Sequence, residues 1–295
     1  MPIKSRRSLR TAAQALIFAC AWLTGHAHLA HASAAQPTLI TLAPHLTELA
    51  YTAGAGEHLV GVVEYSNWPE AALDLPRIGD AFRFDMEAIV SLDPKIALAW
   101  RGGTPQAVAD QLAQLGVEVV WIDTQTLDDI KTALEHIGQV AGTTDVANTE
   151  AKAYAAELAA WQNRALPDTT SPPVRVFYQI ADRPLYTFGG RHVINEVLAT
   201  CHADNVFADV DTEALSVDPE SVLAAQPDMI LSGHEPRASK EASDPLEVWA
   251  PHLDGALADT TLVSVDPNLL VRPTPRIVQG IEALCRLIKA HQEAP

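Results

Sequence analysis

Short runs of β-branched and apolar residues alternate with helical patterns along most of the chain. The runs TLITLAP, LVGVVEY and VEVVWID lie in the first half, and VRVFYQI and LVSVDP lie in the second. Such runs are typical of buried strands in parallel sheets. Between them, TPQAVADQLAQLG and TLDDIKTALEHIGQVAG place apolar residues three and four positions apart, as amphipathic helices do. The pattern therefore predicts an α/β fold with mainly parallel sheets.

One helix–turn–strand pattern occurs twice. MEAIVSLDPKIALA begins at Met86 and PESVLAAQPDMILS begins at Pro219, so the two align without gaps at an offset of 133 residues. The alignment matches Glu87 with Glu220 and places a turn before each buried strand. Because the two copies lie in opposite halves, we predict two lobes of related α/β architecture.

A long helical segment lies between these halves. TTDVANTEAKAYAAELAAWQNRALPD is rich in alanine, has no Gly and no Pro before Pro167 near its end, and carries apolar residues at helical spacing. A helix of about 20 residues spans about 30 Å, enough to run beside both lobes. We predict a signal segment at 1–34, an N-terminal lobe at 35–142, a linking helix at 143–168 and a C-terminal lobe at 169–295, with a ligand cleft between the lobes.

The first 34 residues have the pattern of an export signal. Four basic residues precede the apolar run TAAQALIFACAWLTG, and LAHASAA then supplies small residues for cleavage near Ala34. The run is shorter than the roughly 20 apolar residues of a spanning helix. A lipidated Cys20 is an alternative, although the bulky Phe18 disfavours it. These features predict a protein exported to the periplasm.

Charge and cysteine content narrow the possible partners. Without the signal, 16 basic residues face 37 acidic ones, a net charge of −21, which argues against binding to nucleic acid. Cys201 and Cys285 are then the remaining cysteines. In an oxidising compartment an even pair suggests one disulfide, with two separate buried thiols as the alternative.

The ends of the predicted strands supply candidates for a ligand site. Ligands of open α/β sheets bind outside the carboxyl ends of the strands. Strand ends here carry aromatic side chains and glycines, which suit a large, flat, partly apolar ligand and allow backbone to approach it. The aromatic, apolar and glycine candidates from this pattern are Tyr65, Trp68, Trp100, Gly102, Gly103, Tyr186, Phe188, Gly189, Gly190 and Leu269. Arg101, His234 and Asn268 lie in the same strand-end segments and join the predicted ligand contacts.

Catalytic and metal-binding motifs find less support. The sequence holds no G-x-S-x-G elbow, H-E-x-x-H pair or phosphate loop, so we do not predict an enzyme. The histidines outside the signal lack mutual ligand spacing, and His234 in a predicted cleft loop is the one that could touch a ligand or a metal. We predict no metal site and no cofactor. An exported enzyme using Asp85 and Asp182 as acid and base is the remote alternative.

The chain from TLITLAPHLTELAYTAGAG to RPTPRIVQGIEALC resembles the periplasmic cobalamin-binding proteins of ABC importers. These belong to the helical-backbone class of binding proteins, which also carries siderophores and haem. AWRGG followed by QL-x-x-LG-x-x-V-x-W-x-D is similar to the cobalamin members in particular. The resemblance implies capture of cobalamin or a related corrinoid, delivery to a dimeric ABC permease, and a monomer when free.

The resemblance also implies roles for single residues. Tyr65 matches a tyrosine that contacts the corrin, and Trp100, Gly102 and Gly103 match a strand-end wall. Glu87 and Glu220 match the acidic residues, one per lobe, that dock onto permease arginines. Cys201 and Cys285 match a cysteine pair of the family, which supports the disulfide.

Two aromatic contacts of that family are absent or moved in this chain. Ala81 and Phe82 stand where the family has a cleft tryptophan, so Phe82 joins the predicted ligand contacts. Asn268, Leu269 and Leu270 replace an Asp-Trp-Phe run. A haem or ferric-siderophore ligand in the same fold is the alternative. Arg101, Arg191 and Arg272 could bind an anionic siderophore, and a Tyr or His could ligate haem iron.

Overall fold

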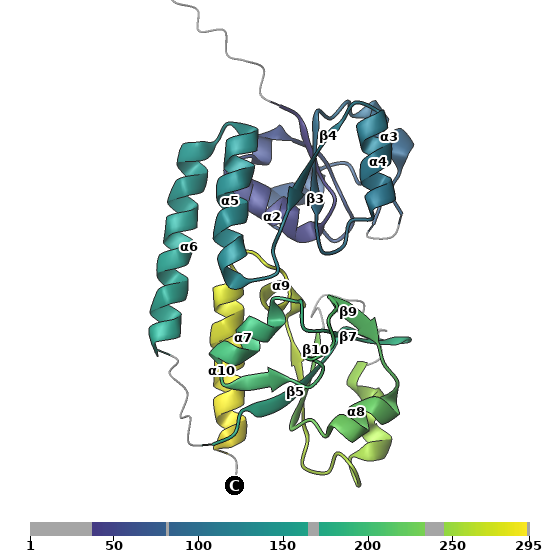
Figure 1. Cartoon of the computed structure of the whole chain (residues 1–295), viewed down its shortest axis with the longest axis vertical. Coiled ribbons are helices and arrows are strands. Elements are labelled where there is room, and N and C mark those ends of the chain that lie inside the picture. The colour runs from purple at the N-terminus through teal and green to yellow at the C-terminus, as the bar shows by residue number, and fades with distance from the viewer. Residues whose placement is uncertain (1–36, 81–82, 165–170, 234–244, 294–295) are drawn as a thin grey trace, which may run out of the picture. The chain divides into compact units, whose positions relative to one another are not determined.

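A computed structural model describes residues 37–80, 83–164, 171–233 and 245–293, and it confirms the α/β architecture. The first sheet has the strand order β2-β1-β3-β4, and its strands are all parallel. Its strands and the helices around it, shown in purple and blue in Figure 1, are β1 (Leu39–Thr41), α2 (Pro44–Thr52), η1 (Gly56–His58), β2 (Leu59–Val62), η2 (Glu70–Asp74), α3 (Met86–Ser91), β3 (Ile96–Trp100), α4 (Gln106–Gln114) and β4 (Glu118–Ile122). We call this part, up to Gly142, the N-terminal lobe.

The second sheet has the same kind of order, β8-β5-β10-β11, and is also parallel. Its elements are β5 (Val174–Gln179), α7 (Ile194–Thr200), β8 (Ala203–Asn205), α8 (Pro219–Ala225), β10 (Met229–Gly233), η3 (Pro245–His252), β11 (Thr261–Val265), α9 (Pro267–Leu270) and α10 (Ile277–Gln292). We call the part from Ser171 onward the C-terminal lobe.

A small antiparallel sheet accompanies the second lobe. It contains β6 (Ala181–Asp182), β7 (Leu185–Phe188) and β9 (Ala214–Ser216) in the order β6-β7-β9. None of the apolar runs that predicted strands covers residues 181–216. Short strands of two to four residues carry too little periodicity to be recognised in a sequence.

The sequence repeat is also a structural repeat. Asp85 and Asp218 cap α3 and α8, each accepting a hydrogen bond from the backbone N–H three residues later. The turns that follow place Asp93 and Gln226 in left-handed backbone, with φ of 44° and 48°. Strands β3 and β10 then begin at the matching residues Ile96 and Met229. Both strands lie second from one edge of their sheet, so the repeat fixes topology as well as local structure.

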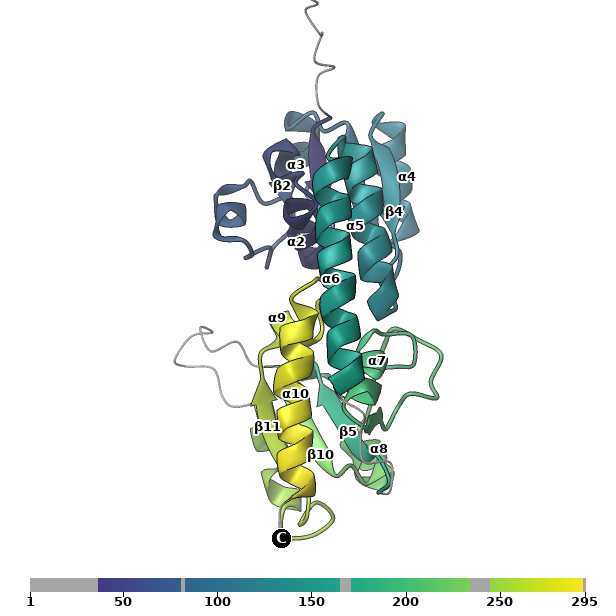
Figure 2. The ribbon, with the colours of Figure 1, turned by 90° about the vertical axis from the view of Figure 1, so that its left-hand side faces the viewer.

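A long helix, α6 (Thr144–Arg164), links the lobes and packs along α5 (Leu127–Ala141). Helix α5 ends at Gly142 in left-handed backbone, and α6 turns back along it, beside α10 (Figure 2). Of the six predicted apolar positions, Ala147, Ala151, Tyr154 and Leu158 are buried, Trp161 is partly buried, and Ala165 lies outside the described residues. Gly138 allows close contact, because a Cβ there would collide with the methyl group of Ala147. The described part of the predicted 143–168 helix is therefore helical, while the exact lobe boundaries remain a prediction.

One of the hydrophobic clusters spans both lobes. This cluster contains Leu39 and Leu98 from the first sheet together with Val176 and Leu231 from the second. Helices α5, α6, α7 and α10 also contribute to it. Because protein interiors are closely packed, a shared core resists the large hinge motions that flexible linkers permit.

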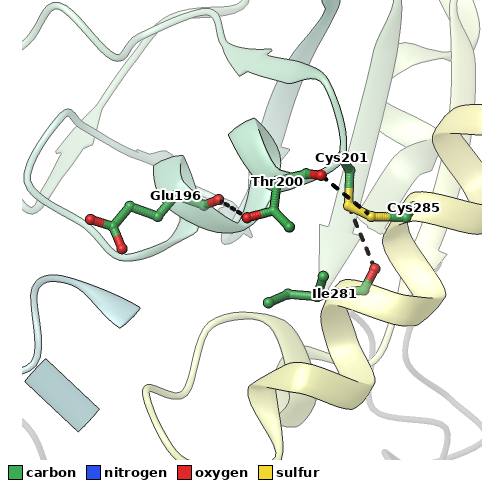
Figure 3. Close-up of a disulfide and its surroundings, with 5 residues drawn as sticks. All are labelled: Glu196, Thr200, Cys201, Ile281 and Cys285. Carbon is green, nitrogen blue, oxygen red and sulfur yellow. Dashed lines mark hydrogen bonds between the residues drawn. A yellow bond between two sulfur atoms is a disulfide. The ribbon is translucent and has the colours of Figure 1, made fainter. Parts of the chain in front are cut away.

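The disulfide joins Cys201 to Cys285 with 4.7 Å between their Cα atoms, which confirms the predicted pair. Cys201 closes α7 and Cys285 lies in α10, one turn after Ile281 (Figure 3). The bridge therefore fastens the last helix to the C-terminal lobe. None of the helices among the described residues is long and apolar enough to cross a membrane.

Candidate ligand-binding site

A cavity of about 250 Å³ lies at the carboxyl ends of β1, β2 and β3, where the sequence predicted a ligand site. Its lining combines backbone and side chains from these strand ends with an aromatic wall and two acids, namely Leu42, Ala43, Pro44, His45, Val63, Glu64, Tyr65, Asp80, Phe84, Trp100, Gly103 and Thr104. The residues share a wall because the parallel strands all end on this edge of the sheet. Tyr65, Trp100 and Gly103 are thereby brought together.

Trp100 folds back over its own turn. A Cβ on Gly102 would lie 2.8 Å from the indole ring, and one on Gly103 would be closer still. The Trp100 ring packs on both glycines, and Gly103 also lines the cavity, so ligand contact by their backbone remains a prediction. The backbone N–H of Trp100 donates to Thr104 Oγ1 at 3.0 Å. The indole N–H of Trp100 is buried and has no acceptor within the described residues, so a ligand oxygen could satisfy it.

Tyr65 is the most exposed large aromatic residue of the described chain, with 72% of its surface accessible. Its backbone has φ of 64°, in the left-handed region that residues other than Gly rarely adopt. The ring is therefore held by its backbone and not by packing. Exposed aromatic surface beside a cavity is typical of binding sites.

Two buried histidines, one from each lobe, lie near this wall. His45 contacts Trp100 edge to face, with 5.2 Å between ring centroids, and His192 stacks on Phe188 at 3.7 Å. Burial lowers the pKa of His45 to about 3, helped by the positive charge of Arg272 and by His192. Burial likewise lowers the pKa of His192 to about 3. Both rings are therefore neutral at physiological pH, and sequence spacing gave no signal for either.

The predicted contacts from the C-terminal lobe are more enclosed. Phe188 is 8% exposed and packs against His192 and Tyr178. A Cβ on Gly189 would collide with the backbone of Thr212 and Val210, so this glycine serves chain packing. Asn268 and Leu269 lie half-buried in α9, where Asp266 caps the helix by accepting from the backbone N–H of Asn268 at 2.9 Å. Ligand contact by these residues remains a prediction, and Phe82 and His234 lie outside the described residues.

Three arginines named as possible anion-binding groups already face carboxylates. Arg101 lies 3.7 Å from Asp123 and stacks over Trp121, and Arg191 lies 3.5 Å from Asp211. Arg272 lies 3.0 Å from Glu48. An anionic siderophore would have to compete with these acids, so the structure gives that alternative little support.

Burial and nearby charges also shift the pKa of Glu213, an acid of the C-terminal lobe. Burial raises the pKa of Glu213 to about 7, and Asp123 of the N-terminal lobe raises it further, while Arg191 opposes the shift. The backbone oxygen of Glu213 accepts from the N–H of Gly189 at 3.1 Å. Glu213 is therefore a titratable group beside the predicted Gly189 contact.

A buried ionic cluster joins the lobes, and the sequence analysis missed it. Glu48 of α2 is 2% exposed and pairs with both Arg272 and Arg276, which follow α9. Arg276 also stacks over Trp68, 4.4 Å from the ring centroid. More than 220 residues separate the partners, so spacing carries no signal, although an acid on the buried face of an apolar helix could have marked Glu48.

The two predicted docking acids occupy equivalent places. Glu87 and Glu220 are the second residues of α3 and α8, and both are exposed. Neither belongs to the cavity lining described above. Their placement fits a surface role in each lobe, whereas the ligand cavity is formed elsewhere.

Comparisons with known proteins show which family has this sequence and fold. The periplasmic binding protein family matches residues 39–245. A vitamin B12-binding protein of Vibrio cholerae is 32% identical over 86% of this chain and 90% of its own length. A vitamin B12-binding protein of Pectobacterium atrosepticum is 30% identical over 94% of this chain and 97% of its own length.

Solved structures show the same arrangement. The periplasmic vitamin B12-binding protein BtuF of Vibrio cholerae has a TM-score of 0.75 at 31% identity, covering 88% of this chain and 99% of its own. The periplasmic heme-binding protein RhuT from Roseiflexus, at 24% identity, has a TM-score of 0.73 over 87% of this chain and 99% of its own, which shows a shared fold alone. The chain therefore belongs to the periplasmic binding protein family, a family of substrate-binding proteins.

Proposed function

We propose that this protein captures cobalamin or a related corrinoid in the periplasm and delivers it to an ABC-type permease. The observation that carries the proposal is that the aromatic wall of the cavity suits the kind of ligand after which the relatives are named. Relatives named vitamin B12-binding proteins match most of the chain at 30–32% identity, and the aromatic cavity wall stands where a flat ligand would lie.

The site suits an amide-rich macrocycle. Tyr65 and Trp100 offer aromatic surface to a corrin ring, and Phe188 is the proposed contact from the other lobe. The buried indole N–H of Trp100 needs an acceptor, which an amide oxygen at the ring edge would supply. The cavity of about 250 Å³ is too small for a whole corrinoid, so the ligand would place one edge there and span the space towards the C-terminal lobe.

Capture of this kind needs no chemistry by the protein. The corrinoid is the transported ligand and not a resident cofactor, and its cobalt would keep its own base as a ligand. Among the described residues, no group of three or more His, Cys, Asp or Glu side chains could hold a metal ion. The protein would leave the ligand unchanged and release it on docking.

Delivery would use Glu87 and Glu220. Their equivalent positions in two related lobes match a permease built from two like subunits, each of which would present an arginine to one glutamate. Export would use residues 1–34 as a signal cleaved near Ala34. Before docking, the protein would act as a monomer.

Calorimetric titration of the mature protein with cyanocobalamin, haem and a ferric siderophore tests the proposal. Saturable one-to-one binding of cyanocobalamin, with much weaker binding of the other two, is expected. Tight binding of haem or siderophore together with no heat from cyanocobalamin would assign the fold to another ligand.

A further inference from the structure

The loop that carries Tyr65 is held from the other lobe. After β2 the chain turns through Tyr65, Asn67 and Trp68 before it reaches η2. Arg272 donates to the backbone oxygen of Tyr65 at 3.1 Å and to Asn67 Oδ1 at 2.7 Å. Arg276 covers the ring of Trp68. Two arginines of the C-terminal lobe thus contact three positions of one N-terminal loop.

Glu48 fixes the direction of both guanidinium groups. Arg276 donates to the two carboxylate oxygens of Glu48 at 3.0 and 2.8 Å, and Arg272 donates to one of them at 3.0 Å. Side-chain exposure is 14% for Arg272 and 19% for Arg276, so water competes little for these bonds. Charge-assisted, forked hydrogen bonds of this kind restrict orientation strongly.

The segment that carries the arginines is itself rigid. Asp266 caps α9, and the backbone oxygen of Leu269 packs so closely on Gly280 of α10 that a Cβ there would collide with it. The N–H of Thr274 donates to the oxygen of Arg272 at 2.8 Å between the two helices. Arg272 therefore extends towards the Tyr65 loop from a segment whose backbone is held by packing and hydrogen bonds.

Within the N-terminal lobe, the loop has anchors on the other side. Ser66 Oγ lies 2.9 Å from Thr47 Oγ1, and Arg77 donates to the oxygen of Ser66 at 3.2 Å. These contacts hold Ser66, which is buried, but they leave the Tyr65 ring in solvent. The left-handed backbone of Tyr65 costs free energy, and the bond from Arg272 to its carbonyl offsets part of that cost.

From this geometry we infer that Arg272 and Glu48 are positioning residues, which set the Tyr65 loop for ligand capture without acting as anion-binding groups. This inference rests on the proposed function, because it assigns Tyr65 to the ligand wall. Arg272 acts through Tyr65, so its effect on affinity disappears when the Tyr65 ring is removed.

A double-mutant cycle tests this dependence. Arg272→Ala should weaken cyanocobalamin binding about tenfold with Tyr65 present, but less than about threefold in a Tyr65→Ala background. Arg286→Ala, which removes an exposed pair with Glu282 on α10, is the control and should leave affinity unchanged. An equal loss in both backgrounds, or no loss in either, would overturn the inference.

Two further measurements keep the test decisive. If Arg272→Ala lowers the melting temperature, Arg272→Lys takes its place in the cycle, because a lysine keeps the charge beside Glu48 but lacks the fork that reaches Asn67 and Tyr65 together. Hydrogen exchange of peptides covering residues 63–70, without ligand, should speed up in either variant and not in Arg286→Ala. Unchanged exchange in this segment would refute the positioning role of Arg272, whether or not the parent binds cyanocobalamin. Failure of the parent to bind cyanocobalamin would count against the proposed function alone.

Discussion

The helix, turn and strand of residues 85–100 and their counterparts at 218–233 share one backbone geometry, but the two strands end in different surroundings. Both begin with a capping aspartate, both expose a glutamate at the second helical position, and both turn through left-handed backbone. Strand β3 then ends at Trp100 in the wall of a cavity, whereas β10 ends at Gly233, against Tyr178 and Pro267.

This difference separates two tasks. The shared part gives each lobe the same helix, turn and strand and exposes one acid in each, which would suit docking to a symmetric partner. The end of β3, which differs from the end of β10, lines the cavity that we propose as the ligand wall, and that wall would have to match an asymmetric molecule. Mutations in the shared part should therefore affect delivery or stability, and mutations at the strand ends should affect affinity.

The largest expected effect concerns delivery. The double variant Glu87→Ala, Glu220→Ala should bind ligand as the parent does, because neither acid lines the cavity. Transport into vesicles carrying the permease should fall steeply, since each lost acid leaves an arginine unpaired, at about 2 to 5 kcal/mol if the pair is buried. High salt should also lower transport by the parent, because it screens exposed ion pairs. Unchanged uptake by the double variant would remove the docking role.

The disulfide should stabilise one lobe more than the other. Replacing Cys201 and Cys285 by serine opens a cross-link over a sequence separation of 84 residues, for which chain entropy suggests a loss of up to about 4 kcal/mol in unfolding free energy. Urea unfolding followed by hydrogen exchange should show α7 and α10 losing protection before β1 and β3. Equal loss in both lobes would show that the shared core couples them fully.

Trp100→Ala should remove the aromatic part of the divergent strand end. Loss of a desolvated aromatic anchor weakens binding by about 2 kcal/mol, near thirtyfold. Trp161→Ala, a change to a partly buried residue on α6 that does not line the cavity, is the matched control and should leave affinity unchanged. Calorimetry with cyanocobalamin measures both, and equal affinities for the two variants would move the site elsewhere.

The buried histidines should make the protein sensitive to acid. His45 and His192 keep a pKa of about 3 when folded, below the ordinary 6.5, so the unfolded chain binds protons in this window that the folded chain does not. Stability should therefore fall as pH drops from about 6.5 towards 3, by up to about 1.4 kcal/mol per pH unit for each histidine.

Glu213 acts in the opposite direction. Its folded pKa of about 7 exceeds the usual 4.5, so its contribution to stability rises as pH falls from 7 to 4.5. The net loss should be steepest below pH 4.5. Urea unfolding at several pH values should show a flatter acid limb for His192→Asn than for the exposed-residue control His136→Asn, and identical limbs would contradict the assignment.

The smallest effects should come from the capping aspartates. Asp85 accepts from the N–H of Ala88 at 3.0 Å and Asp218 from that of Ser221 at 2.7 Å. Hydrogen bonds from the side chain and the backbone N–H of Ser221 lower the pKa of Asp218. Asp85→Ala and Asp218→Ala should each lower the melting temperature slightly and by similar amounts, because the two caps satisfy equivalent helix ends. Asn at either position should restore most of the loss, and a large difference between the two would show that the repeats are not equivalent in energy.

The local sequence was a good guide to elements and a poor guide to contacts between them. Alternating apolar runs predicted the parallel strands, and the spacing of Ala147, Ala151, Tyr154 and Leu158 predicted the linking helix. The packing of the Trp100 ring on Gly102 and Gly103 had no signal in the sequence, because a sequence does not show which side chain will occupy the space above a glycine. The antiparallel pairings of β7 with β6 and β9 had no signal in the sequence, because these strands are too short to show a periodic pattern.

The sequence by itself determined the two-lobed α/β plan, the repeat with its matched glutamates, the linking helix and the strand ends from which a site could be built. These features depend on hydrophobic period and turn chemistry, which act over a few residues. Only the tertiary structure decided that Glu48 meets Arg272 and Arg276, and that His45 and His192 are buried and neutral. Those properties depend on which distant residues share a desolvated space, and packing of the whole chain sets that space.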